Sequence, residues 1–331
     1  MTTIQEVLDR AVTEGGVPGI LAEVHDGDRR WFGTAGVADT ATGAPRLPEH
    51  RFRIGSTTKT FVATVLLQLV AEGRLCLDDA VERWVPGVGE WTSVRQLLNN
   101  TSGIFSYTDD HAALGQHEHY TPDMLVKIAM SRPADFAPGT SWGYSNTNYV
   151  LAGMVVERVT GARLAEEIAG RFGLPGTYLP EDEAIRGPHS RHYTKLYDPD
   201  PNAPIHDVTE LDPSPFWAAG AMISTAGELN RFFGDLLGGR LLPPGLMREM
   251  TSTVPTKDWI DGTAYGLGLV ELRLPSGVAV WGMAGAIFGS WTYTFGSRDG
   301  SHLVSANING DWSDATGILD GLLEAEFSPT R

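Results

Sequence analysis

The apolar residues of this chain repeat with a period of two near both ends and with a helical period between them. Close to the start, Gly19 to His25 and Arg30 to Gly36 alternate apolar and polar residues around Gly27, which predicts a hairpin of two strands. Towards the end, the same alternation predicts strands at 265–272, 278–283, 290–296 and 302–308. Since strands must pair to bury their apolar faces, this pattern favours one antiparallel sheet built from both termini.

Helical spacing dominates the middle of the chain, and terminal helices are predicted at 1–15 and 314–326. The internal helices are predicted at 57–72, 93–98, 146–159 and 227–237, and three of them are closed by a glycine stop signal, at Gly73, Gly161 and Gly238. A Pro- and Asp-rich stretch at 173–215 has no sustained period and predicts a long surface excursion. We therefore expect an α+β fold. An α/β sheet domain, 1–55 and 247–331, would be flanked by helices and would carry a mostly helical inserted domain, 56–246.

Charge and composition exclude several kinds of partner. The 331 residues include 25 Lys and Arg against 41 Asp and Glu, so the formal net charge is -16. This sign disfavours nucleic acid and anionic membrane surfaces as partners. The single cysteine, Cys76, excludes an intrachain disulfide, and we expect it to be a small core residue.

The chain also lacks the sequence signals of membrane insertion or export. Its most apolar stretch, 61–70, is too short to span a bilayer and contains Gln68. The first fifteen residues predict an amphipathic helix rather than a secretory signal. We expect a cytoplasmic protein, or a secreted one if a leader has been removed.

A serine and a lysine three residues apart open the most apolar predicted helix. Ser56 follows Gly55, and Lys59 lies one helical turn later, so both side chains share a face. A serine hydroxyl needs a neighbouring base, and a lysine acts as one when burial lowers its pKa. By itself the pattern also fits a helix N-cap followed by a lysine that extends to solvent.

Two further motifs could complete such a site. Tyr144 and Asn146 precede an apolar helix, where a phenol can relay protons and an amide can orient a lysine. Taken alone, the motif is explained better by an aromatic loop residue and a helix N-cap. The small-residue stretch 281–286 allows a close approach of the backbone, as an oxyanion hole requires, or simply forms a β-bulge.

Together the three motifs resemble those of the serine β-lactamase and penicillin-binding superfamily, which are S-x-x-K, Y-x-N and a K/H-x-G strand. The similarity is greatest to the class C β-lactamase and D-alanyl-D-alanine carboxypeptidase branch, peptidase family S12, with its esterases and transacylases. It extends to phrases such as FRIGSTTKTF, APGTSWGYSNTNYVLAGMVVE and YGLGL, and it covers nearly the whole chain.

The resemblance implies a catalytic role for three side chains. Ser56 would be the acylated nucleophile, Lys59 the general base for acylation and Tyr144 the proton relay. Asn146 would position the lysine and the substrate. The oxyanion hole would combine the backbone N–H of Ser56 with that of Ala286, which follows Gly285.

Four more residues are expected at the substrate-binding cleft. Trp217 matches an aromatic residue that lines the cleft in relatives, and Trp142 precedes the Tyr144 motif. Met283 and Ala284 begin the third motif. The resemblance implies neither a metal nor another cofactor.

The third motif departs from the family pattern. Met283 stands where the family has His or Lys, and a thioether carries no charge. The positions that grip a peptide carboxylate in the carboxypeptidases are here Ala284, Ala286 and Val270, and Arg273 is out of phase with Val270 along a strand. Losing two or three charge-assisted hydrogen bonds costs about a hundredfold in affinity or more. We therefore expect a neutral ester, amide or other neutral acyl donor.

Three functions stay open at this stage. The first is a serine hydrolase or acyltransferase whose partners are a small-molecule acyl donor and water or an amine acceptor. The second is a D-alanyl-D-alanine carboxypeptidase or class C-type β-lactamase, and the third is a non-catalytic binding module on the same fold. The histidines at 111, 117 and 119 form the densest metal-ligating cluster, but their spacing fits solvated loop residues better than a metal site.

Overall fold

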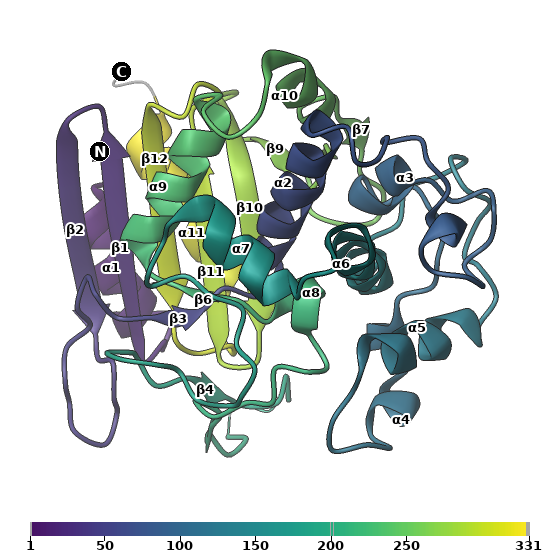
Figure 1. Cartoon of the computed structure of the whole chain (residues 1–331). Coiled ribbons are helices and arrows are strands. Elements are labelled where there is room, and N and C mark those ends of the chain that lie inside the picture. Colours follow the sequence, from purple (N-terminus) through teal and green to yellow (C-terminus); the bar gives the residue numbers. More distant parts are fainter. Residues whose placement is uncertain (1, 199, 201, 329–331) are drawn as a thin grey trace.

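An eight-stranded sheet forms the centre of the protein (Figure 1), whose computed structural model describes residues 2–198, 200 and 202–328. The strand order is β2-β1-β12-β11-β10-β9-β8-β7, and all neighbours are antiparallel. The strands are β1 (Gly19–Asp26), β2 (Arg29–Gly36), β7 (Val254–Pro255), β8 (Thr263–Tyr265), β9 (Val270–Arg273), β10 (Ala279–Ile287), β11 (Ser290–Gly296) and β12 (His302–Ile308).

The two ends of the chain meet where β1 pairs with β12. Ile20 lies opposite Ile308, and the register continues to Asp26 opposite His302. This pairing confirms the α+β fold with a sheet shared by both termini. The proposed domain boundaries at 55 and 246 remain predictions.

The predicted strand at 265–272 is wrong because the chain turns within it. Strand β8 ends at Tyr265 and β9 begins at Val270. Between them, Gly268 adopts a φ of +75°, and the Gly266 N–H donates to the carbonyl of Leu269 over 2.7 Å. Alternation alone cannot show a two-strand hairpin when the turn itself contains leucines. Strand β10, in contrast, extends to Ile287, beyond the predicted end at 283.

Helices cover both faces of the sheet (Figure 1). Helices α1 (Ile4–Thr13) and α11 (Ala315–Phe327) pack together on one face. Helix α9 (Ala226–Leu237) lies on the other face, where Asn230 accepts a hydrogen bond from Ser305 on β12 and donates to the backbone of β1. The sheet is therefore buried on both sides, which makes it a rigid support for the neighbouring helices.

The remaining helices form a second group, which contacts α9 through the rings of Phe61, Phe172 and Phe232. They are α2 (Thr58–Ala71), α3 (Val94–Leu98), α4 (His111–Leu114), α5 (Pro122–Met130), α6 (Asn146–Thr160), α7 (Leu164–Phe172), α8 (Trp217–Gly220) and α10 (Pro244–Met250). Helices α2 and α6 end as predicted, each followed by a glycine at positive φ, Gly73 and Gly161. Helix α6 packs against α2, α3, α5, α7 and α8, so it forms the centre of the helical region.

Short pieces of strand connect the two regions. Strand β3 (Phe52–Arg53) pairs with β6 (Ile223–Ser224), immediately before the predicted nucleophile. The excursion at 173–215 holds only β4 (Tyr193–Thr194) and β5 (His206–Asp207) among its described residues, as its lack of a period predicts.

Two smaller features complete the description. Cys76 is exposed, so its predicted core position is wrong. Within the part of the chain that the structure describes, no helix is both long and apolar enough to cross a membrane.

Candidate active site

Ser56 lies in a one-turn 3-10 helix, Gly55–Thr57, that leads directly into α2. From Phe52 to Leu67 every residue is buried except Ser56, which is partly exposed. The nucleophile candidate is thus the one point where this otherwise enclosed segment reaches solvent. Because it stands at the start of a helix, the helix dipole favours negative charge that develops there.

Lys59 lies fully buried one turn further along and has three hydrogen-bond partners. Its Nζ is 3.0 Å from Ser56 Oγ, 2.7 Å from Asn146 Oδ1 and 2.7 Å from the carbonyl oxygen of Ala219. All three partners are uncharged, so no carboxylate among them offsets the cost of burying an ammonium. Burial lowers the pKa of Lys59 well below its ordinary value, which favours a neutral amine.

Tyr144 approaches Ser56 from the other side. Its Oη donates to Ser56 Oγ over 2.7 Å, and Lys59 Nζ lies 4.9 Å from the centre of its ring. Burial, with a smaller contribution from the nearby Tyr265 phenol, raises the pKa of Tyr144 well above its ordinary value. The phenol therefore stays protonated and can act as a proton donor.

Asn146, the first residue of α6, is held in one orientation by groups that sequence reasoning missed. Its Nδ2 donates to Thr108 Oγ1 over 3.0 Å, and its backbone N–H donates to Ser106 Oγ over 3.1 Å. Since the amide nitrogen is already turned to Thr108, the amide oxygen faces Lys59. The loop carrying Ser106 and Thr108 has no motif in the sequence that links it to α6.

The backbone of the third motif packs against Ser56, the candidate nucleophile. A Cβ added at Gly285 would lie 2.0 Å from the carbonyl oxygen of Ile54 and 2.8 Å from the nitrogen of Ser56. A Cβ at Gly55, whose φ is +51°, would lie 2.7 Å from the nitrogen of Ala286. Only glycine permits this contact, which brings β10 beside the start of α2.

An aromatic cluster covers Tyr144, and its outer member was not foreseen. Trp259, in the loop between β7 and β8, stacks on Tyr144 with ring centres 5.4 Å apart. Trp142 is buried behind this pair, 5.5 Å from Trp259 and 5.8 Å from Tyr265. Trp142 therefore supports the cluster instead of lining an open cleft. No sequence motif links Trp259 to the catalytic groups, because it is brought there from a distant loop.

The predicted substrate-binding residues of α8 and β10 lie in different surroundings. Met283 is fully buried in the hydrophobic core, so it presents no surface to a ligand in this structure. Ala284 is partly exposed, and Ala286 is exposed. Trp217 packs on Gly153 of α6 and borders a separate cavity of about 220 Å³ with His119 and Pro213.

The three positions that match the family's carboxylate grip hold the uncharged residues Ala284, Ala286 and Val270. Val270 is buried in β9, and its neighbour Glu271 lies 3.5 Å from Arg273. The Arg273 guanidinium also donates to the carbonyl of Gly277 and is largely exposed. As the strand phase predicts, Arg273 and Val270 lie on opposite faces of β9.

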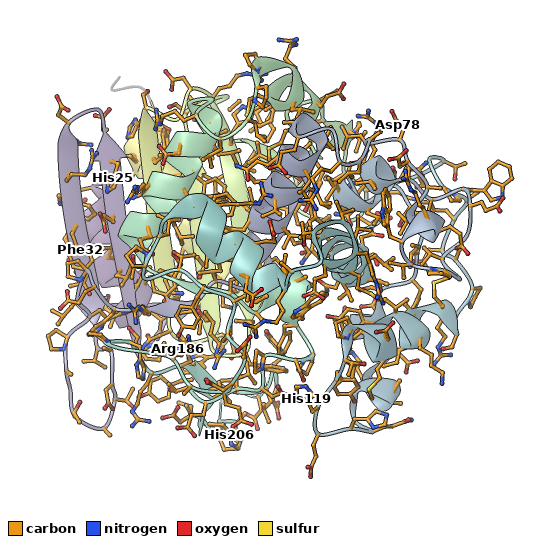
Figure 2. The ribbon with its side chains drawn as sticks, viewed as in Figure 1. His25, Phe32, Asp78, His119, Arg186 and His206 are labelled. Atoms are coloured by element: carbon orange, nitrogen blue, oxygen red, sulfur yellow. The ribbon has the colours of Figure 1, made fainter. Side chains whose placement is uncertain are left out.

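The histidines at 117 and 119 contact different partners. Figure 2 shows His25 at the left of the molecule and His119 and His206 along its lower edge. His117 packs edge-on against Tyr120, and His119 Nδ1 is 3.6 Å from Asp212. Nowhere in the described ranges do three His, Cys, Asp or Glu side chains gather closely enough to hold a metal ion.

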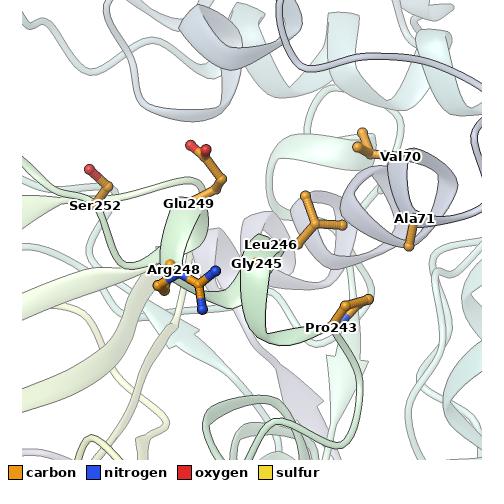
Figure 3. A pocket seen from close by; sticks show the side chains of 8 residues that line it. All are labelled: Val70, Ala71, Pro243, Gly245, Leu246, Arg248, Glu249 and Ser252. Carbon is orange, nitrogen blue, oxygen red and sulfur yellow. The ribbon is translucent and has the colours of Figure 1, made fainter.

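A groove of about 660 Å³ lies between the end of α2 and α10, lined by residues that include Val70, Leu246 and Arg248 (Figure 3). Val70 lies at the end of α2, whereas Ser56 lies in the 3-10 turn just before α2 begins. At 1.5 Å per residue they are about 20 Å apart, so this groove is separate from the catalytic candidates.

The curated proteins that this chain resembles include an esterase and penicillin-binding proteins. Esterase EstB from Burkholderia gladioli is 34% identical over 191 residues, which cover 52% of this chain and 48% of the esterase. The match thus spans about half the length of this curated relative.

Solved structures match over almost the whole chain. A D-stereospecific amidohydrolase from Streptomyces sp. is 44% identical with a TM-score of 0.89, covering 99% of this chain and 98% of the other. The D-amino acid amidase from Ochrobactrum anthropi SV3, complexed with L-phenylalanine amide, is 28% identical with a TM-score of 0.88 and 97% coverage of both. The model of the family described as Beta-lactamase matches residues 4–322. The chain belongs to the Beta-lactamase family.

Proposed function

We propose that this protein is a serine hydrolase or acyltransferase that forms an acyl-enzyme on Ser56 from a neutral amide or ester. The acyl group then passes to water or to an amine. The observation that carries the proposal is the buried Lys59 amine, 3.0 Å from Ser56 Oγ and surrounded only by uncharged hydrogen-bond partners.

If the Lys59 amine is neutral, its hydrogen bonds support one arrangement of protons in the resting site. A neutral lysine amine has two N–H groups and one lone pair. The carbonyl oxygens of Asn146 and Ala219 can only accept, so they take the two N–H groups. The lone pair is left for the hydroxyl proton of Ser56, while Ser56 Oγ accepts from Tyr144.

This arrangement supports a balanced acylation step. Ser56 Oγ bonds to the acyl carbon as its proton moves to Lys59 Nζ, and the carbonyl π electrons move to the oxygen. When the tetrahedral intermediate collapses, the bond to the leaving group breaks and Tyr144 protonates that group. The Lys59 ammonium returns a proton to the phenol, so the serine proton has in effect passed to the leaving group. The N–H groups of Ser56 and Ala286 would bind the oxyanion.

The proposed acyl donors are amides and esters of D-amino acids, whose carboxyl group is uncharged because it is amidated or esterified. The names of the amidohydrolase and amidase neighbours support the amide class. The alanines at 284 and 286 and the outward pairing of Arg273 support a donor without a free carboxylate. An apolar side chain on the donor would suit Phe216 and Phe288, whose rings are 6.4 Å apart on the segments next to α8 and Ala286.

Intact mass spectrometry tests the proposal directly. The protein is incubated with p-nitrophenyl esters, D- and L-phenylalanine amide, a penicillin and a D-alanyl-D-alanine peptide, with and without an amine acceptor. We expect the esters and the D-amide to give a transient acyl adduct, which Ser56→Ala abolishes. Ser131→Ala is the control and should form the adduct as wild type does, since Ser131 is exposed. Folded wild-type protein that acquires no adduct from any donor overturns the proposal.

The same panel separates the two other functions. Stable labelling by penicillin with release of D-alanine would identify a carboxypeptidase or β-lactamase. Binding of a donor without turnover, at an affinity that Lys59→Ala leaves unchanged, would identify a non-catalytic module.

A further inference from the structure

Two of the three partners of Lys59 come from elements that contact each other. Asn146 opens α6, and Ala219 lies in the single turn of α8, which packs on α6 and α2 (Figure 1). Gly153 lies two helical turns after Asn146 and therefore on the same face of α6. One face of α6 thus supplies an acceptor to Lys59 and also supports the element that supplies the other.

The contact between α6 and α8 is closer than any side chain at position 153 would allow. A Cβ added at Gly153 would lie 2.6 Å from the Cβ of Ala218 and 2.9 Å from Cζ3 of Trp217. Gly153 is buried in the middle of α6, where glycine lowers helix stability. The close approach of α8 explains why glycine is nevertheless needed there.

Trp217 shows that α8 is held in place against a local backbone preference. Its φ is +29°, in the left-handed region that a residue with a Cβ adopts only at a cost. Such a conformation persists because surrounding contacts impose it, and here the indole rests on Gly153. Two residues later, the carbonyl of Ala219 accepts from Lys59 over 2.7 Å.

We propose that the contact of Gly153 with Trp217 and Ala218 is a positioning contact for catalysis, which holds the Ala219 carbonyl against Lys59 so that its lone pair faces Ser56. Trp217 is then a positioning residue behind the site and not a substrate-binding residue. The proposal rests on the base role of Lys59 in the proposed function. In this proposal, the packing contact between α6 and α8 sets the orientation of the Lys59 amine.

Gly153→Ala tests the contact by pushing α8 away from α6. We expect the acylation rate constant with a p-nitrophenyl ester to fall ten- to a hundredfold with little change in KM. The acid limb of the variant's acylation pH profile should move to lower pH. The Lys59 ammonium loses the Ala219 carbonyl as an acceptor, so the pKa of Lys59 falls further. Gly170→Ala is the matched control, since a Cβ at Gly170 of α7 meets no atom within 4 Å.

A double variant tests whether the loss of space between α6 and α8 causes the effect. In Gly153→Ala combined with Ala218→Gly, the methyl group changes sides and the closest clash, at 2.6 Å, disappears. We expect this pair to recover most of the acylation rate and the wild-type acid limb. A merely structural role would leave the acid limb unmoved in Gly153→Ala, and this outcome overturns the proposal. So does a limb that moves to higher pH.

A measurement independent of turnover keeps the inference separate from the proposed function. The chain has four lysines, at 59, 127, 195 and 257, so ¹³C-labelled lysine gives few Cε signals to follow by NMR. The Lys59 signal, identified by its loss in Lys59→Met, should titrate at lower pH in Gly153→Ala than in wild type. If wild type forms no acyl adduct but this shift occurs, the proposed function fails and the contact stands. If wild type acylates and the titration is unchanged, the contact fails alone.

Discussion

Lys59 Nζ lies 2.7 Å from Asn146 Oδ1, although 87 residues separate them in the chain. The contact joins the first turns of α2 and α6 and fixes the lysine with a neutral acceptor instead of a carboxylate. A carboxylate would stabilise the ammonium and hold the pKa of the lysine high. The amide orients the amine without stabilising its charged form, and this is the physical basis of the base role that we propose for Lys59.

Replacing the lysine should abolish acylation while the protein still folds. Lys59→Met keeps the length and apolar body of the side chain but removes the lone pair that accepts the Ser56 proton. General bases contribute about 10² to 10⁴-fold to rate, so we expect a loss of this size in stopped-flow acylation. Lys127→Met, at an exposed position of α5, should match wild type. Acylation within tenfold of wild type would show that another group is the base.

The depressed pKa of Lys59 also predicts how stability changes with pH. Unfolded lysine titrates near pH 10.4, whereas burial keeps the folded pKa well below its ordinary value. The unfolded chain therefore binds more protons between these two pKa values, and stability rises with pH across that window. Wild type should gain thermal stability relative to Lys59→Met as pH increases towards 10. If the melting temperatures of wild type and Lys59→Met change in parallel from pH 7 to 10, the Lys59 amine is not neutral in the folded protein.

A buried histidine away from the site predicts sensitivity to acid. Both ring nitrogens of His192 are buried without hydrogen-bond partners, and burial, followed by the nearby Arg53, lowers its pKa well below the ordinary 6.5. Its neutral form is stable above the unfolded pKa, and stability is lost as pH falls below about 6.5. The expected slope is about 1.4 kcal/mol per pH unit for one proton. In urea unfolding, His192→Phe should lack this component, and an unchanged slope would exclude His192 as its source.

A methyl group at Gly285 should disrupt the nucleophile directly. The added Cβ would lie 2.0 Å from the carbonyl oxygen of Ile54, so β10 and the turn before α2 must separate. If Ser56 and Ala286 N–H groups bind the oxyanion, Gly285→Ala should reduce the acylation rate about a hundredfold or more. Circular dichroism and the melting temperature establish whether the variant folds. A folded variant with wild-type acylation kinetics contradicts this placement of the oxyanion hole.

Removing Trp259 should change how Tyr144 titrates. The indole stacks on the phenol ring and helps to shield it from water. Trp259→Ala exposes Tyr144, so its raised pKa should fall towards the ordinary value. Because the proton donor must be neutral, the alkaline limb of the acylation profile should move to lower pH. Trp91→Ala, which removes an indole that is 83% exposed, serves as the control. An alkaline limb that coincides with wild type would show that the stack does not protect Tyr144.

Local patterns in the sequence account for the elements and for the residue types of the site. The strands near both termini, the helices that begin near Ser56 and Asn146, and the glycine stops all follow from spacing. The turn at Gly266–Leu269 does not, because its leucines continue the apolar alternation of the strands around it. Cys76 likewise looked like a core residue by type, but it lies exposed in the loop after α2.

The sequence alone determined an α+β chain with a serine and a lysine on one helical face and a third motif that lacks the family's cation. Only the tertiary structure decided which groups meet them. Ala219 acts through a carbonyl that every residue possesses, and Trp259 arrives from a loop 115 positions after Tyr144, so neither leaves a pattern in the sequence. Burial of the amine, which sets its protonation, is likewise a property of the packed helices and not of the lysine itself.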